Sequence, residues 1–174
     1  MLKAAAERFA EHGFAGTSVR DITRSAGCNI AAVNYYFGSK EELYTAVFEA
    51  RFAELRDYRI GALRGIMQRA DLTLELVLRT FATAFLEPLI EESRGRQTLQ
   101  LFMRDLVSSR LPEGMMVEQM IKPTSVALLD ALRRVCPDID TKSAQLCMHS
   151  LVAQLIHILQ AQRLMAHIHT PLKP

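Results

Sequence analysis

Long hydrophobic runs, paired cysteines and strand-like alternation are all scarce in this 174-residue sequence, and each absence excludes a class of protein. No apolar run approaches the roughly 20 residues of a membrane-spanning helix, and the amino terminus has no signal-peptide pattern. The three cysteines, Cys28, Cys136 and Cys147, form no CxxC pair, so neither a disulfide framework nor a zinc site is indicated. We therefore expect a cytoplasmic protein with no metal and no other cofactor.

Motifs of catalysis are missing as well. The sequence contains no GxSxG, no glycine-rich phosphate loop, no HExxH and no clustered pair of carboxylates in an apolar setting. A net charge of +2 says little about partners by itself. The expected function is therefore not enzymatic.

What the sequence does contain is helical spacing of its apolar residues. Residues of the hydrophobic types make up 49% of the chain, and they recur three and four positions apart between short Gly, Pro, Asp and Ser punctuation. This pattern predicts an all-α protein. Its length suffices for a sizeable core in one domain or two small ones.

The first 45 residues predict three short helices. A helix ends near Gly13, Ser18 and Asp21 form a capping-box-like start, Gly27 permits a sharp turn, and Asn29 caps the next helix. This layout is that of a helix-turn-helix, although spacing alone leaves an ordinary helical hairpin inside a bundle open. The residues predicted to share its core are Phe9, Phe14, Val19, Ile22, Val33 and Phe37.

Three consecutive aromatic residues follow, Tyr35, Tyr36 and Phe37. Only about every third or fourth position of a helix faces inward, so the three rings cannot all be core. We expect Phe37 to point inward and both tyrosines to point outward. The long helix predicted next starts at "GSKEEL", with Gly38 as terminator and Ser39 as N-cap.

The stretch "AAAERFAEHGFAGTSVRDITRSAGCNIAAVNYYFGSKEELYTAVF" resembles the DNA-binding domain of the TetR family of transcriptional repressors. The shared elements, in register, are F-x-x-x-G-F, T-[ST]-V-x-x-I, A-G, an aromatic pair with Phe, and [ST]-K-x-x-L. Within the family, "NIAA…YYFGSKEELY" and "LFMRDLVSSRLP…MIKP" are similar to the CecR-like branch. The resemblance implies an α-helical homodimer, with a DNA-binding head at residues 1–45 and a helical ligand-binding and dimerisation domain at 46–174. It implies a repressor that binds a palindromic operator and that a small hydrophobic effector releases.

A recognition helix at this position would contact DNA through a defined set of residues. The tyrosine hydroxyls can donate to phosphates, and Lys40 adds a charge at a helix start. Ile30, Ala31 and Ala32 offer only apolar contact to thymine methyls, which leaves Asn34 as the best hydrogen-bonding reader. The predicted DNA-binding residues are Thr17, Ser18, Arg20, Arg24, Asn29, Ile30, Ala31, Ala32, Asn34, Tyr35, Tyr36 and Lys40.

The predicted head has no excess of positive charge. Residues 1–45 contain five basic and five acidic side chains. Affinity for DNA depends strongly on positive charge, so either the basic residues gather on one face or a basic arm of the kind found in the family supplies the balance.

The remainder of the chain predicts a ligand cavity and a dimer interface. Methionine and aromatic stripes suit a pocket that adapts to varied ligands, although for any single one of these residues the pattern favours plain core. Arg104 and Asp105 are candidate polar anchors for a ligand, and a solvated helix face is an equally open reading of the pair. The predicted pocket residues are Phe52, Met67, Phe81, Phe85, Phe102, Met103, Met116 and Met120.

The last predicted helix, Thr141–Leu164, is apolar on more than one side, which favours burial against a copy of itself. The predicted dimer-interface residues are Leu151, Leu155, Ile158 and Leu159. A different class of protein also fits the pattern, a helical protein-interaction module without DNA binding. Strong salt dependence of binding to duplex DNA would favour the repressor.

Overall fold

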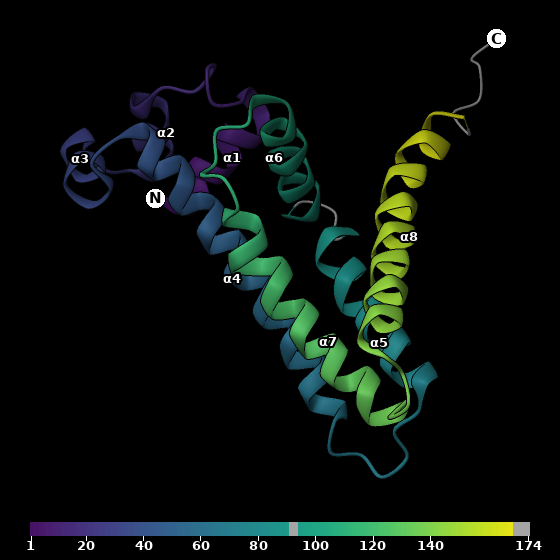
Figure 1. Cartoon of the computed structure of the whole chain (residues 1–174). Helices are drawn as coiled ribbons and strands as arrows, with labels where there is room; N and C mark the ends of the chain where they lie inside the picture. The colour runs from purple at the N-terminus through teal and green to yellow at the C-terminus, as the bar shows by residue number, and fades with distance from the viewer. Residues whose placement is uncertain (91–93, 169–174) are drawn as a thin grey trace. The chain divides into compact units, whose positions relative to one another are not determined.

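The computed structural model describes residues 1–90 and 94–168, with the side chains of the last helix described as far as residue 161. Within these ranges every regular element is helical, as the sequence predicted (Figure 1). The elements are α1 Leu2–His12, α2 Val19–Ala26, α3 Ile30–Phe37, α4 Lys40–Ile66, α5 Leu74–Ile90, α6 Arg94–Ser108, a π-helical turn Val117–Ile121, α7 Lys122–Val135 and α8 Thr141–Ile168.

Local side chains set the starts of the short helices. The Ser18 hydroxyl accepts the backbone N–H of Asp21, and the Asp21 carboxylate accepts the backbone N–H of Ser18, which completes the predicted capping box of α2. Asn29 Oδ1 accepts the Ala31 N–H at 3.0 Å, and the Ser39 hydroxyl accepts the Glu42 N–H at 3.0 Å. All three predicted N-caps are confirmed.

The chain forms two compact units, which are treated separately below. Unit 1 comprises Met1–Asp57 and Glu91–Lys122, and unit 2 comprises Tyr58–Ile90 and Pro123–Pro174. Helix α4 contributes to both, because it runs without a break from Lys40 to Ile66. The predicted domain boundary after residue 45 therefore falls inside unit 1.

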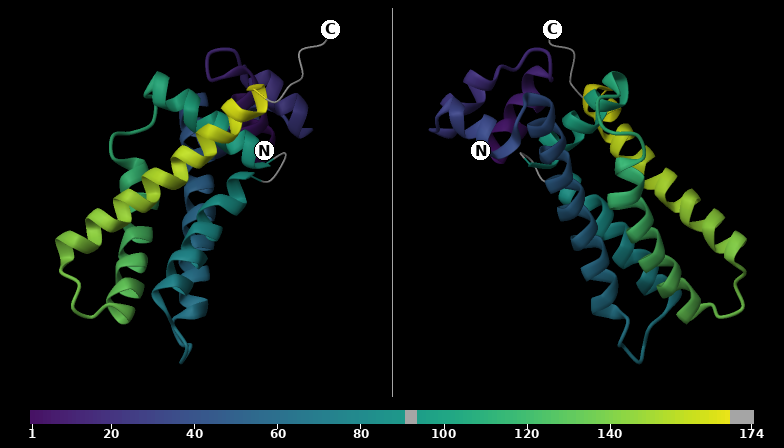
Figure 2. Two further views of the ribbon diagram at one scale, coloured as in Figure 1. Left: turned by 90° about the vertical axis from the view of Figure 1, so that its right-hand side faces the viewer. Right: turned by 60° about the vertical axis from the view of Figure 1, so that its left-hand side comes forward.

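Unit 1 is built around a line of aromatic rings. The ring of Phe9 in α1 meets that of Tyr44 edge-on, with 5.0 Å between the ring centroids. The Tyr44 and Phe48 centroids are also 5.0 Å apart, and Phe48 stacks on Phe102 of α6 with a centroid separation of 5.8 Å. Phe9 and Phe48 are almost completely buried. Each such pair is worth about 0.5–1.5 kcal/mol beyond its buried area. The rings therefore bind α1, α4 and α6 into one core, and α1 lies beside α6 in both figures (Figures 1 and 2).

The helical chain does not break at Pro123. Instead it takes a π-helical turn just before it, in which the Lys122 N–H donates to the Val117 carbonyl. Proline has no N–H for the carbonyl four residues earlier, that of Gln119, and its ring crowds that group. Arg56 Nη1 donates to the Gln119 carbonyl at 3.3 Å, so the acceptor that Pro123 leaves empty is satisfied from α4.

Unit 2 combines the last turns of α4 with α5, α7 and α8. Helices α5 and α8 pack on each other (Figure 2). Pro88 lies inside α5, which continues two residues beyond it. The buried side chains of unit 2 are Arg59, Leu63, Val77, Phe81, Ala84, Phe85, Leu89, Thr124, Leu128, Ala131, Leu132, Ala144, Met148, Leu155 and Leu159. Among the described residues, no helix is both long enough and apolar enough to span a bilayer.

Candidate nucleic-acid interface

A three-residue turn joins α2 to α3. Gly27 is left-handed, with φ 63° and ψ 33°, which residues with a Cβ adopt only with strain. The next N–H, of Cys28, returns to the Thr23 carbonyl at 3.0 Å and closes the end of α2. Asn29 then caps α3. The chain therefore leaves one short helix and enters the next with little freedom, as a helix-turn-helix requires.

The outward face of α3 carries the two tyrosines. Tyr35 is 82% exposed and Tyr36 71% exposed, with their rings edge-to-face at 5.0 Å, while Val33 is fully buried and Phe37 partly buried. The aromatic run is thus divided as the sequence predicted. The other predicted readers that are exposed are Asn29, Ile30, Ala31 and Asn34, and Ala32 is partly buried.

Thr17 does not belong to this surface, which corrects the sequence prediction. Its side chain is 2% exposed, and its hydroxyl lies 3.0 Å from the Arg8 carbonyl and 2.7 Å from the Gly13 carbonyl, to which it donates. The hydroxyl therefore donates to the Gly13 carbonyl, which lies just beyond the last turn of α1. Thr17 therefore fixes the link between α1 and α2, and Ser18, which is exposed, is the first residue of the candidate surface.

The positively charged side chains of the candidate surface differ in their contacts with neighbouring groups. Arg20 is exposed, and Arg24 is exposed with Asp21 at 3.7 Å. Hydrogen bonds from Ser18 hold the pKa of Asp21 below its usual value, so this carboxylate stays charged beside Arg24. Lys40 lies over the Phe14 ring at 4.1 Å, and partial burial lowers its pKa.

Three residues of α6 and the loop after it hold this head together, and the sequence did not reveal their role. Arg104 donates from Nε to the Ala10 carbonyl at 2.9 Å and from Nη2 to the Glu11 carbonyl at 2.8 Å. Asp105 accepts from the Tyr44 hydroxyl at 3.3 Å, and the Arg110 guanidinium carbon lies over the Phe14 ring, 4.3 Å from its centroid.

Arg104 and Asp105 thus serve the contact of α6 with α1 and α4, and the prediction that they anchor a ligand is not supported. Burial, followed by the nearby Asp105 carboxylate, raises the pKa of Tyr44 to about 12, so its hydroxyl remains a donor at neutral pH. No local motif could have shown these contacts, because some 60 to 90 residues separate the partners.

The predicted ligand-pocket residues are divided between the units. The rings of Phe52 and Phe102 are in contact in unit 1, with 5.6 Å between their centroids. Met116 and Met120 belong to the same unit, as does Met103, which is 45% exposed. Phe81 and Phe85 are in contact inside unit 2. Of the predicted set, only Met67 lines the pocket described next, which lies in unit 2.

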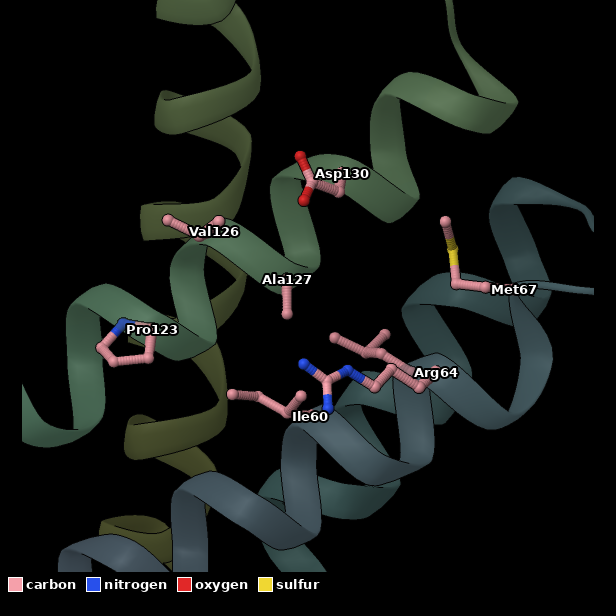
Figure 3. Close-up of a pocket in the computed structure, with 8 residues that line it drawn as sticks. Ile60, Arg64, Met67, Pro123, Val126, Ala127 and Asp130 are labelled. Carbon is pink, nitrogen blue, oxygen red and sulfur yellow. The ribbon is translucent and has the colours of Figure 1, made fainter.

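That pocket lies between α4 and α7 and has a volume of about 400 Å³ (Figure 3). Figure 3 shows Ile60, Arg64 and Met67 on α4 facing Pro123, Val126 and Ala127 on α7, with Asp130 further along α7. Most of its wall is apolar, so it suits the body of a small hydrophobic molecule.

The predicted dimer residues of α8 are also divided. Leu155 and Leu159 are 4% and 8% exposed within a single chain, because they lie on the face that includes Ala144 and Met148 and packs inside unit 2. They are therefore core residues, which corrects the prediction. Leu151 is partly buried, and Ile158 is 42% exposed. The apolar side chains that α8 leaves exposed include Leu146 and Ile156.

Two family models cover most of the chain. Residues 1–47 match the model of bacterial regulatory proteins of the tetR family, and residues 79–173, just over half of the chain, match a tetracyclin repressor-like C-terminal domain. The structure is similar to that of a putative transcriptional regulator from Pseudomonas aeruginosa PAO1, with a TM-score of 0.68 over 94% of this chain and 77% of that one. At 22% identity this likeness shows the fold alone.

Curated relatives match mainly at the head. The HTH-type transcriptional dual regulator CecR of Shigella flexneri is 52% identical over 46 residues, 26% of this chain and 20% of CecR. The HTH-type transcriptional repressor NicS of Pseudomonas putida is 42% identical over 53 residues, 30% of this chain and 25% of NicS. The matched segment thus spans a quarter or less of these relatives. Together with the helix-turn-helix and the two matched domains, these findings show that the chain belongs to the TetR family of transcriptional regulators, which are DNA-binding proteins and not enzymes.

Proposed function

We propose that this chain is a cytoplasmic, ligand-responsive repressor that binds a palindromic operator as a homodimer. The observation that carries the proposal is the outward face of α3, where Tyr35 and Tyr36 are exposed at the end of a helix capped at both ends. NicS, which matches at the head, is a transcriptional repressor by name, and this supports repression. The 46-residue match to CecR supports a place near the CecR-like branch.

The head would contact DNA in two ways. The tyrosine hydroxyls donate to phosphate oxygens, and Arg20 and Arg24 on α2 add charge along the backbone, which positions the protein but reads no sequence. Sequence is read by the start of α3, where Ile30 and Ala31 touch thymine methyls and the Asn34 amide bonds an adenine edge. With so few hydrogen-bonding groups, recognition of DNA shape contributes much of the specificity.

A homodimer places two such heads on successive major-groove half-sites, about 34–36 Å apart. A small hydrophobic effector in the helical part of the chain favours a spacing of the heads that does not fit these half-sites, and the operator is released. Release requires that the effector bind the two arrangements with different affinity, because equal affinity would shift nothing.

Selection of bound duplexes from a pool of random DNA tests the proposal. We expect a palindromic winner, whose affinity falls steeply as salt rises, because each neutralised phosphate releases counterions. A winner without two-fold symmetry would contradict the homodimeric reading. Salt-insensitive or absent binding to any duplex would instead favour the helical protein-interaction module.

A further inference from the structure

Two positively charged side chains of unit 1 lie over the same aromatic ring, that of Phe14. The Lys40 ammonium nitrogen lies 4.1 Å from the ring centroid, and the Arg110 guanidinium carbon lies 4.3 Å from it. Lys40 begins α4, whereas Arg110 lies in the loop that follows α6, some 70 residues later. The fold therefore brings together two cations that are remote in the sequence.

Neither cation is neutralised within the part of the chain that the structure describes. No ion pair and no side-chain hydrogen bond is found there for Lys40 or for Arg110, whose backbone N–H alone donates to Asp105. Partial burial lowers the pKa of Lys40; Glu41 opposes this shift and the nearby Arg110 adds to it. A ring face attracts cations but accepts no strong directed hydrogen bond. An anion would therefore provide acceptors that these two side chains lack.

The two cations adjoin the candidate DNA-binding surface. Phe14 lies in the link between α1 and α2, four residues before the Ser18 cap, and Lys40 follows the last residue of α3, Phe37, by three positions. The first turn of α4 also presents backbone N–H groups at the positive end of a helix dipole, which favours a phosphate group at the same place.

The charge balance of the head points to the same segment. Residues 1–45 carry five basic and five acidic side chains, so the head by itself has no positive excess. The segment 94–110 carries four arginines and one aspartate: Arg94, Arg96, Arg104, Arg110 and Asp105. Arg94 is bonded to Glu54 and Arg104 to carbonyls of α1, whereas Arg110 shares a ring with Lys40 of the head. Positive charge of the kind that DNA binding depends on is therefore available from this segment.

We propose that Arg110 contacts the DNA backbone together with Lys40, so that a residue beyond α6 extends the phosphate-binding surface of the helix-turn-helix. The Phe14 ring holds both side chains at the site, and phosphate oxygens supply the acceptors and the negative charge that both lack. Phosphates are the same in every sequence, so Arg110 raises affinity without reading bases. The inference rests on the proposed function, since it requires that the head bind duplex DNA.

Binding of the full chain to duplex DNA at several salt concentrations tests the inference. Fluorescence anisotropy gives the affinity for two labelled duplexes of equal length, the one selected from the random pool and one of mixed sequence. Arg110→Gln should reduce the slope of log affinity against log salt by about 0.9 for each subunit on the DNA, because one counterion fewer is released there. Affinity for both duplexes should fall by the same factor, roughly threefold to tenfold for each subunit.

Two further variants separate a contact with phosphate from other roles. Arg110→Lys keeps the charge and should keep the slope. Arg96→Gln is the matched control, because it removes an exposed arginine from α6 in the same unit, and it should leave slope and affinity unchanged. A purely structural role of Arg110 on the Phe14 ring would leave the slope unaltered in every variant.

An unchanged slope for Arg110→Gln would overturn the inference, and so would an equal reduction for Arg96→Gln, which would point to net charge alone. A loss confined to the selected duplex would also overturn it, because a phosphate contact weakens binding to every sequence. A selected duplex without two-fold symmetry, bound with the reduced slope in Arg110→Gln, would contradict the proposed homodimeric repressor and leave this inference intact. Absence of binding to either duplex would overturn both.

Discussion

At the scale of single residues, Tyr35 and Tyr36 are both more than two-thirds exposed, and the proposed repressor would use their hydroxyls to contact the DNA backbone. We predict that the double change Tyr35→Phe and Tyr36→Phe weakens binding to the selected duplex by about tenfold to a hundredfold, because it removes two hydrogen bonds to charged phosphates. Fluorescence anisotropy with a labelled duplex measures the effect.

Tyr58→Phe is the matched control, because Tyr58 is also an exposed helical tyrosine, with its hydroxyl bonded to Glu87 in unit 2. It should leave DNA affinity unchanged. Sedimentation should show the same association state for all variants. Unaltered affinity in the double variant would show that the hydroxyls do not contact DNA.

Arg59 of α4 permits a prediction on stability, because its side chain is buried and its Nε–H has no acceptor among the described residues. The guanidinium lies over the Phe85 ring, but a buried charge that lacks a counter-anion costs more than this contact returns. Replacing buried ions by apolar groups of similar volume is often stabilising by about 1–4 kcal/mol. We therefore predict that Arg59→Met raises the melting temperature of the ligand-free chain at pH 7 by about 2–4 °C, measured by differential scanning calorimetry.

The pH dependence of this effect has a definite sign. The folded-state pKa of Arg59 is about 10, below its ordinary value of 12.5, so the folded state binds fewer protons between these values and the cost of the charge is relieved as pH rises. The advantage of Arg59→Met should be complete below pH 10 and shrink above it. A lower melting temperature for Arg59→Met at pH 7 would show that the cation–π contact outweighs the desolvation.

At the scale of the elements, local signals made the head predictable. The caps at Ser18, Asn29 and Ser39 and the left-handed Gly27 depend on neighbours within four residues, so the sequence contains the information directly. The burial of Thr17 could not be predicted from its neighbours in the sequence. A threonine beside an N-cap is equally suited to solvent, and only the approach of the α1 carbonyls buries it.

The contact of α6 with α1 illustrates what spacing cannot reveal. Arg104 supplies two donors to carbonyls that α1 leaves open at its end. We predict that Arg104→Ala lowers the stability of unit 1 by about 1–2 kcal/mol, because two charge-assisted bonds are lost from a largely exposed side chain. Hydrogen exchange of the α1 amides should report the loss as faster exchange.

Arg96→Ala on the same helix removes an exposed arginine and is the control for charge and helix propensity. Arg104→Lys should recover only part of the protection, since one ammonium cannot match the fork that bonds Ala10 and Glu11. Equal exchange in Arg104→Ala and the unaltered chain would mean that ring packing alone holds α1 in place.

At the scale of the whole molecule, the sequence predicted the helical class and the kind of head, but it assigned too few residues of α8 to the chain's own core. A helix with apolar residues on several sides can pack against its own chain and against a partner chain. Periodicity does not tell which side of the helix does which. The structure resolves this for Leu155 and Leu159, which are buried within one chain. Periodicity likewise could not show which of the candidate pocket residues lie together, and Phe52 and Phe85 belong to different units.

For the proposed homodimer, the apolar side chains that α8 leaves exposed are the candidate contact with a partner copy. Leu146 is 57% exposed and Ile156 44% exposed, and both lie outside the buried face that holds Met148 and Leu155. We predict that Leu146→Glu together with Ile156→Glu shifts the chain from dimer to monomer, because two carboxylates would be desolvated in a symmetric interface. Sedimentation velocity measures the shift, and circular dichroism should show unchanged helix content.

Two comparisons separate the interface from the fold. Leu74→Glu changes an exposed leucine of α5 in the same unit and should leave the dimer intact. Leu155→Ala should lower the melting temperature whatever the association state, since truncating a buried leucine costs about 2–5 kcal/mol. If Leu146→Glu and Ile156→Glu together left a dimer, α8 would not carry the interface. The two reading heads would then have to be spaced by another surface of the chain, and the coupling of effector to operator would have to pass through it.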